Sequence, residues 1–182
     1  AMINRHFQDL PTTIIEPGVK TGVPLLVDNP KEIGADRIVN TLAAHTLYDQ
    51  GACIVVDFGT STNFDVVSPK GEFLGGALAP GIEISVEALA SRAAQLRKVE
   101  FVKPRSVIGK NTVEALQSGA LYGFAGQVDG ILQRIIAEIG PLKAVVATGG
   151  LAPLVVEESS TITHHEPDLT LEGLRLVFEK NK

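Results

Sequence analysis

Two acidic side chains, Asp57 and Asp36, stand where a carboxylate could act on a phosphate-bearing substrate. Asp57 opens the run DFGTST at 57–62, directly after an apolar segment that predicts a strand. A carboxylate at a strand end, followed by a glycine turn and hydroxyls, can hold a cation and present donors to phosphate oxygens. Because Asp-x-Gly is also a common turn, this run by itself indicates a turn more often than a site.

Asp36 lies in the run GADR at 34–37, in the first turn or two of a predicted helix. A helix N-terminus carries partial positive charge and unpaired amides, so it favours an anionic group of a substrate. A carboxylate there is a weak base, which phosphoryl transfer tolerates because positioning and charge neutralisation carry most of the rate. The alternative is an Asp36 that only complements the helix dipole and an Arg37 in a solvated ion pair.

Three glycine-containing runs are further candidates for contact with a ligand. The run GGALAPG at 75–81 puts two glycines inside a predicted strand, which indicates a bulge or the close approach of a ligand or of other backbone. The run TGG at 148–150 follows an apolar strand but lacks the G-x-G-x-x-G spacing of a dinucleotide site. The run GKNT at 109–112 precedes a long helix with four interior glycines, each costing about 0.8–1 kcal/mol against alanine. We expect that helix to pack closely against another helix, in this chain or in a partner subunit.

The hydrophobic pattern predicts the elements that must position these residues. Asn29-Pro30 is typical of a helix start, with Asn as the N-cap and Pro in the first turn. The order after that helix is three strands, of which the last two form a hairpin, then two helices, a strand, a helix, a strand and a helix. The predicted ranges are 52–58, 62–67, 72–78, 82–96, 112–139, 143–148, 151–157, 161–163 and 171–180.

The first 28 residues predict a different kind of segment. Residues 2–7 have the pattern of a helix end, 12–16 that of a strand, and 17–30 that of a linker with three prolines and two glycines. We interpret 1–28 as the tail of a preceding half together with a linker, and 29–182 as one domain.

Composition narrows the classes of partner. Sixteen basic against 21 acidic residues give a net charge of −5, so neither nucleic acid nor an anionic membrane is expected as the main partner. The one cysteine, Cys53, lies in an apolar run, which indicates a buried thiol in a reducing compartment. We find neither a membrane-spanning stretch nor a signal peptide and expect a cytoplasmic protein.

Together, the order and spacing of these runs resemble the type III pantothenate kinases, over about residues 15–178. The resemblance implies a ribonuclease H-like α/β half of the acetate and sugar kinase, Hsp70 and actin superfamily, with a mixed sheet flanked by helices. It implies ATP-dependent phosphorylation of pantothenate to 4'-phosphopantothenate, the first step of coenzyme A biosynthesis, by a homodimer.

The resemblance also assigns roles to individual positions. Asp36 matches the residue that accepts the proton of the pantothenate hydroxyl. Asp57 matches the ligand of a monovalent cation, K⁺ or NH₄⁺, and Mg²⁺ would accompany ATP. The other matching positions are pantothenate contacts at Gly34, Ala35, Arg37 and, across a dimer interface, Thr112, and ATP contacts at Gly59, Thr60, Gly149 and Gly150.

Two departures from the family pattern leave alternatives open. The amino-terminal Asp-x-Gly-Asn-Thr phosphate loop of the family is absent from these 182 residues, so we expect this chain alone to be a poor catalyst. Asn63 stands where the family commonly has threonine. The rivals are a non-catalytic regulatory protein on the same scaffold and a different small-molecule kinase of the superfamily.

Overall fold

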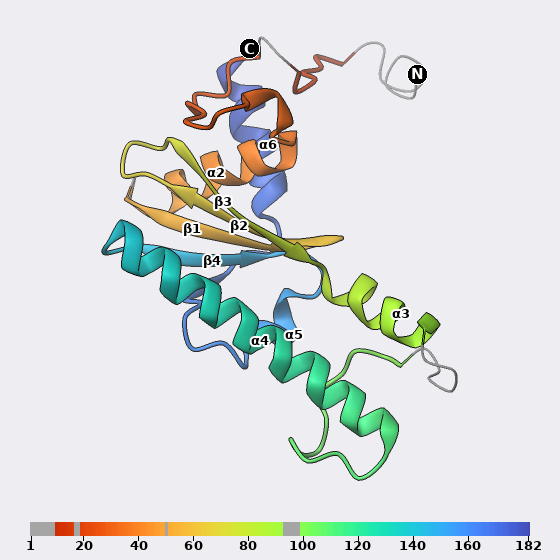
Figure 1. Ribbon diagram of the computed structural model, residues 1–182. Helices are drawn as coiled ribbons and strands as arrows, with labels where there is room; N and C mark the ends of the chain where they lie inside the picture. Colours follow the sequence, from red (N-terminus) through yellow and green to blue (C-terminus); the bar gives the residue numbers. More distant parts are fainter. Residues whose placement is uncertain (1–9, 17–18, 50, 93–98) are drawn as a thin grey trace.

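A five-stranded sheet with helices on both faces forms the body of the protein (Figure 1). The structure, a computed structural model, describes residues 10–16, 19–49, 51–92 and 99–182. In chain order the elements are η1 (Pro30–Glu32), α2 (Ala35–Leu47), β1 (Cys53–Phe58), β2 (Ser61–Val67), β3 (Phe73–Pro80), α3 (Ile82–Arg92), α4 (Thr112–Ile139), β4 (Ala144–Thr148), α5 (Ala152–Val156), β5 (His164–His165) and α6 (Leu169–Lys180).

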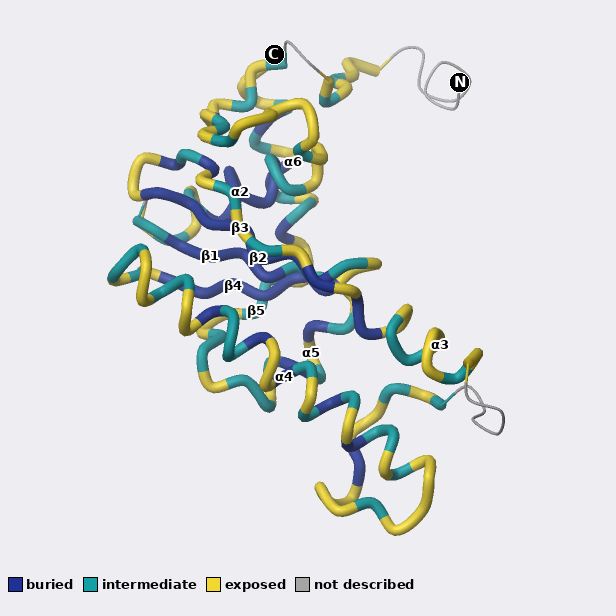
Figure 2. The backbone as a smooth tube through the Cα atoms, viewed as in Figure 1, coloured by how far each residue is buried: buried dark blue, intermediate teal, exposed yellow. Residues whose placement is uncertain are grey.

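The strand order is β3-β2-β1-β4-β5. Strand β1 pairs antiparallel with β2, which pairs antiparallel with β3, whereas β4 runs parallel to β1 and β5 parallel to β4. An apolar run with little alternation is typical of a strand covered on both faces, and Figure 2 shows β1, β2 and β4 buried along most of their length. This mixed topology confirms the predicted ribonuclease H-like α/β half.

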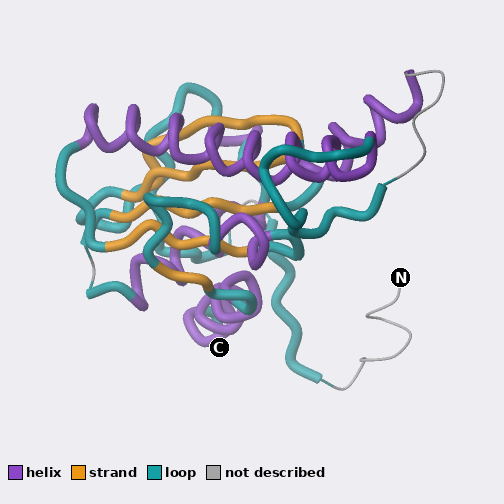
Figure 3. Tube along the Cα trace, turned by 90° about the horizontal axis from the view of Figure 1, so that it is seen from below, coloured by secondary structure: helices purple, strands orange, loops and turns teal. Residues whose placement is uncertain are grey.

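Alternate residues of β1 face two separate cores, because successive side chains of a strand point to opposite faces. Ile54, Val56 and Phe58 pack against α4 and α5. Cys53 and Val55 pack against α2 and the start of α6 on the other face. Figure 3, turned by 90°, shows the sheet as one layer with helices on both sides. The alternation also sets the direction of Asp57, which shares its face with Cys53 and Val55 and is therefore turned toward α2.

The segment before α2 is irregular but packed. Leu25 forms an isolated parallel bridge with Phe73, and the backbone N–H of Phe73 donates to the carbonyl oxygen of Pro24 at 2.8 Å. Val23 joins a core cluster with Val39 of α2 and Val177 of α6. Residues 19–29 of the predicted linker form no helix or strand apart from the bridge at Leu25, and they lie against the domain.

Several predicted elements need correction. Residues 12–16 form no strand, and the helix-end prediction at 2–7 lies outside the described residues. Asn29 does not cap α2: Pro30–Glu32 form a short 3₁₀ turn, and the side-chain amide of Asn29 donates to Glu32. The strand predicted at 161–163 lies instead at His164–His165. These two residues are the ones that pair with Val146 and Ala147 of β4.

The helix predicted at 112–139 is α4 with the same bounds. Among the described residues its glycines do not serve the predicted close helix packing, because added Cβ atoms at Gly119, Gly123 and Gly126 would meet nothing within 4 Å there. Packing against a partner subunit stays a prediction. In the part of the chain that the structure describes, no helix combines the length and the apolar character needed to cross a membrane.

Candidate active site

The run at 34–37 occupies the N-terminal end of α2, as predicted. Gly34 is the N-cap, with extended backbone at φ −62° and ψ 149°, and Ala35, Asp36 and Arg37 form the first turn. Asp36 is exposed, and its Oδ1 lies so close over Gly34 that a side chain at residue 34 would overlap it. This end of the helix therefore offers free backbone amides beside a carboxylate.

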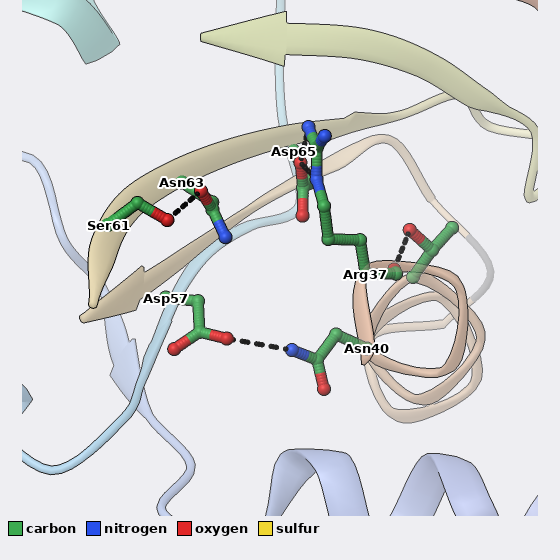
Figure 4. Close-up of polar contacts among 7 residues, drawn as sticks. Arg37, Asn40, Asp57, Ser61, Asn63 and Asp65 are labelled. Atoms are coloured by element: carbon green, nitrogen blue, oxygen red, sulfur yellow. Dashed lines mark hydrogen bonds and ion pairs between the residues drawn. The ribbon is translucent and has the colours of Figure 1, made fainter. Parts of the chain in front are cut away.

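Asp57 reaches toward α2 from the C-terminal end of β1. The amide nitrogen of Asn40 donates to Oδ2 of Asp57 at 3.3 Å (Figure 4), and the hydroxyl of Thr170 in α6 donates to the amide oxygen of Asn40 at 2.8 Å. Because Thr170 occupies the amide oxygen, the nitrogen of the fully buried Asn40 must face Asp57. Helices α2 and α6 thus fix one oxygen of the carboxylate.

The electrostatics of Asp57 connect it to Asp36. Burial raises the pKa of the Asp57 carboxyl above its usual value, the negative charge of Asp36 raises it further, and the hydrogen bond from Asn40 lowers it. Two carboxylates from different elements therefore lie within electrostatic range of each other. The negative charge of Asp36 therefore disfavours the ionised form of Asp57 and favours a bound cation beside it.

A buried ion pair lies beside this carboxylate pair. Nε and Nη2 of Arg37 donate to Oδ1 of Asp65 at 2.9 and 2.5 Å, and the guanidinium carbon lies 5.2 Å from the centre of the Phe73 ring. Asp65 is completely buried, and the Arg37 side chain is 17% exposed. Burial raises the pKa of Asp65, the hydrogen bond and the charge of Arg37 lower it, and the charges of Asp57 and Asp36 raise it, so the pKa lies above its usual value.

The turn after β1 is where the other glycine runs meet Asp57. Gly149 has φ +95°, and a Cβ on it would lie 2.6 Å from the carbonyl oxygen of Phe58 and 2.8 Å from Oδ1 of Asp57. The backbone N–H of Gly81 donates to the carbonyl oxygen of Thr60 at 3.1 Å, and a Cβ on Gly81 would lie 2.6 Å from the carbonyl oxygen of Gly59. Both glycines therefore serve close approach of backbone to the 57–60 turn.

Thr112 is the predicted site residue that the structure does not bring to this cluster. It is exposed at the first turn of α4, which extends past the sheet in Figure 1. Gly150 is exposed, and an added Cβ there would meet nothing within 4 Å among the described residues. Gly59 and Gly149 lie against Oδ1 of Asp57, and Arg37 contacts Asp65 beside it.

Sequence reasoning missed Asn40 and Asp65 as members of the cluster. Asn40 stands in the apolar stripe of α2, and Asp65 stands between Phe64 and Val66 in an apolar strand. The available signal was a polar residue at a position where the hydrophobic pattern predicts burial. Asn63, noted only as a departure from the family, pairs in register with Asp57 across β1 and β2 and accepts a hydrogen bond from Ser61 at 2.9 Å.

The donor set at Asp57 fits a weakly held monovalent cation. Oδ1 of Asp57 makes no hydrogen bond to the described residues, and the adjacent turn supplies carbonyl oxygens. Across the residues that the structure describes, no three His, Cys, Asp or Glu side chains converge as a metal-binding group. A cation here would be held by one carboxylate together with backbone oxygens. Its positive charge would offset the negative charges of Asp36 and Asp57.

Comparison with solved structures supports the fold. A Campylobacter jejuni protein assigned to the Baf family of transcriptional activators matches with a TM-score of 0.55 over 84% of this chain and 66% of that chain. The sequence identity is 21%, so the likeness concerns the fold alone.

Comparison with curated sequences gives the family. A family model described as type III pantothenate kinase matches residues 1–134. The type III pantothenate kinase of Saccharopolyspora erythraea is 70% identical over 99% of this chain and 69% of its own length. That of Frankia alni is 71% identical over 99% of this chain and 72% of its own length. The chain belongs to the type III pantothenate kinases, a family of phosphate-transferring enzymes.

Proposed function

We propose that the cluster around Asp57 is the phosphoryl-transfer site of a pantothenate kinase, which converts pantothenate and ATP to 4'-phosphopantothenate and ADP at the start of coenzyme A synthesis. The observation that supports the proposal is that Asp57, at the end of β1, accepts a hydrogen bond from Asn40 of α2, the helix whose first turn carries Asp36. Phosphoryl transfer needs positioned groups and offset charge more than covalent chemistry, and this cluster supplies both.

We assign each residue a role by its match to the family. The helix N-terminus at Gly34 and Ala35 would bind pantothenate through backbone amides. Asp36 would orient the attacking hydroxyl and accept its proton. Asp57 would hold the monovalent cation, K⁺ or NH₄⁺. That cation and the Mg²⁺ that accompanies ATP would supply positive charge against the phosphates.

The glycine turns would serve ATP. Backbone at Gly59 and the exposed Thr60 would contact the phosphates, and Gly149 and Gly150 would let the adenosine approach the backbone. Thr112, remote from Asp57 in one chain, would reach pantothenate from the partner subunit of a homodimer. Since the one cysteine is a free, buried thiol, a reducing cytoplasm suits the enzyme.

Calorimetric titration tests the proposal. Pantothenate and Mg·ATP are each titrated into the protein in potassium buffer and in tetramethylammonium buffer. We expect both ligands to bind, with potassium strengthening the binding of ATP. Asp57→Asn should abolish the potassium effect and leave pantothenate binding within a fewfold. A protein that binds neither ligand in potassium would contradict the proposed function and favour the non-catalytic rival.

A further inference from the structure

Asp65 is a buried carboxylate that the scaffold itself does not need. It stands on β2 between Phe64 and Val66, and its side chain is completely shielded from solvent. Taking a carboxylate out of water costs free energy, and an apolar residue of similar volume often serves stability equally well. Its presence therefore calls for an explanation beyond folding.

In the Arg37–Asp65 ion pair, two guanidinium nitrogens do not contact two separate carboxylate oxygens. Nε and Nη2 of Arg37 both donate to the single oxygen Oδ1, so Oδ2 of Asp65 has no hydrogen-bond partner among the described residues. Figure 4 shows Asp65 and Asn63 on one strand and Asp57 on the next, all turned toward α2. The pair thus lies between the Asp57 cluster and Phe73, a residue of the core formed with Val39 and Val177.

Two interactions restrain the guanidinium group of Arg37. Two of its nitrogens are held by Asp65, and the group lies over the Phe73 ring at 5.2 Å. Nη1 has no hydrogen-bond partner in the described part of the chain, so its two N–H groups remain available to a ligand.

We propose that Asp65 is a positioning residue: it holds Arg37 so that the free edge of the guanidinium receives the anionic group of the substrate. The inference rests on the proposed function, in which that group is the carboxylate of pantothenate. An arginine held in its bound conformation before the ligand arrives loses little side-chain entropy on binding, which raises affinity. Because Asp65 is buried, solvent ions do not screen the interaction that fixes Arg37.

Two near-isosteric variants separate positioning from folding. Asp65→Leu fills the volume but removes the acceptor, whereas Asp65→Asn keeps an oxygen that can accept from Arg37. Val66→Ala is the matched control, because Val66 is buried on the same strand but faces the other side of the sheet. Nuclear magnetic resonance follows solvent exchange of the Arg37 Nε–H, and calorimetry gives the affinities for pantothenate and Mg·ATP.

In the unmodified protein we expect the Arg37 Nε–H to exchange more slowly than that of the exposed Arg134. In Asp65→Leu the exchange should become as fast as in Arg134, and pantothenate affinity should fall roughly 10- to 100-fold, the effect of small misplacements of a binding group. ATP affinity should stay within twofold. Asp65→Asn should keep most of the slow Arg37 Nε–H exchange and most of the pantothenate affinity. Val66→Ala should change neither readout.

The outcomes distinguish this inference from the proposed function. Slow Nε–H exchange and full pantothenate affinity in Asp65→Leu would overturn the positioning role while leaving the kinase assignment intact. If the unmodified protein holds Arg37 but does not bind pantothenate, the proposed substrate is wrong and the assignment of Arg37 to it falls. Equal loss of pantothenate affinity in Val66→Ala would show a general effect of stability and also overturn the inference.

Discussion

Replacing Gly149 by alanine should destabilise the fold and disturb the site, whereas the same change at Gly150 should leave the stability of the fold unchanged. The two glycines are adjacent, but their surroundings differ. Gly149 has φ +95° and lies against β1, whereas Gly150 is exposed, and an added Cβ there would meet no described residue within 4 Å. Gly150→Ala is therefore a matched control for Gly149→Ala.

The magnitude has two parts. An alanine held at positive φ costs of order 1–3 kcal/mol. Its Cβ would lie 2.6 Å from the carbonyl oxygen of Phe58, in a strand paired on both sides, so neither backbone can yield cheaply. Forcing an extra methyl into such packing costs about 1–3 kcal/mol. The free energy of unfolding should therefore fall by roughly 2–6 kcal/mol.

Urea denaturation at pH 7 and 25 °C measures this difference. Gly150→Ala should stay within about 0.5 kcal/mol of the unmodified protein. Because the new Cβ would also lie 2.8 Å from Oδ1 of Asp57, Gly149→Ala should weaken binding of potassium as well. If Gly149→Ala costs less than about 1 kcal/mol, or Gly150→Ala costs as much as its neighbour, the packing argument for this turn is wrong.

Two further variants probe the charges of the cluster. Arg37→Met leaves the buried Asp65 without its cation and should cost about 3–5 kcal/mol in urea denaturation at pH 7. Without Arg37, the pKa of Asp65 in the native protein would lie further above its value in the unfolded chain. The cost in stability should therefore shrink as the pH falls from 7 toward 4. A cost that does not change with pH would contradict the Arg37–Asp65 ion pair. Asp57→Asn removes a carboxylate whose native pKa is already raised, so in tetramethylammonium buffer it should leave stability at pH 7 unchanged or increased by up to about 1 kcal/mol. That gain in stability should shrink as the pH falls below the raised pKa of Asp57, because the carboxylate of the unmodified native protein then becomes protonated. A net loss of stability in Asp57→Asn at pH 7 would refute the prediction.

Much of the fold could be predicted because local and long-range signals agree. The run at 53–58 is apolar enough to require cover on both faces, and α4 has a helical pattern and an Asn111 cap that accepts from the Glu114 N–H. The start of α2 was placed wrongly because Asn29-Pro30 satisfies the rules for a helix start, although the chain makes only a 3₁₀ turn there. The strand predicted at 12–16 lacks a partner strand, and β-branched residues alone do not make one.

The site was predictable where a residue's chemistry shows in a short motif. Asp36, Asp57 and the glycines at 81 and 149 each mark a helix start, a strand end or a close approach of backbone. Asn40 and Asp65 belong to no such motif, and their importance depends on which elements become neighbours. That information lies in strand register and helix packing, which a single sequence does not display.

The most direct test of the central claim measures the coupling between Asp36 and Asp57. Carbon-13 labelling of aspartate carboxyl groups lets nuclear magnetic resonance follow the titration of Asp57 in the unmodified protein and in Asp36→Asn. The pKa of Asp57 should fall when the charge of Asp36 is removed, and it should not move in Glu138→Gln, a change on α4 at the opposite face of the sheet. An Asp57 titration that is identical with and without the Asp36 charge would show that the two carboxylates do not share a site.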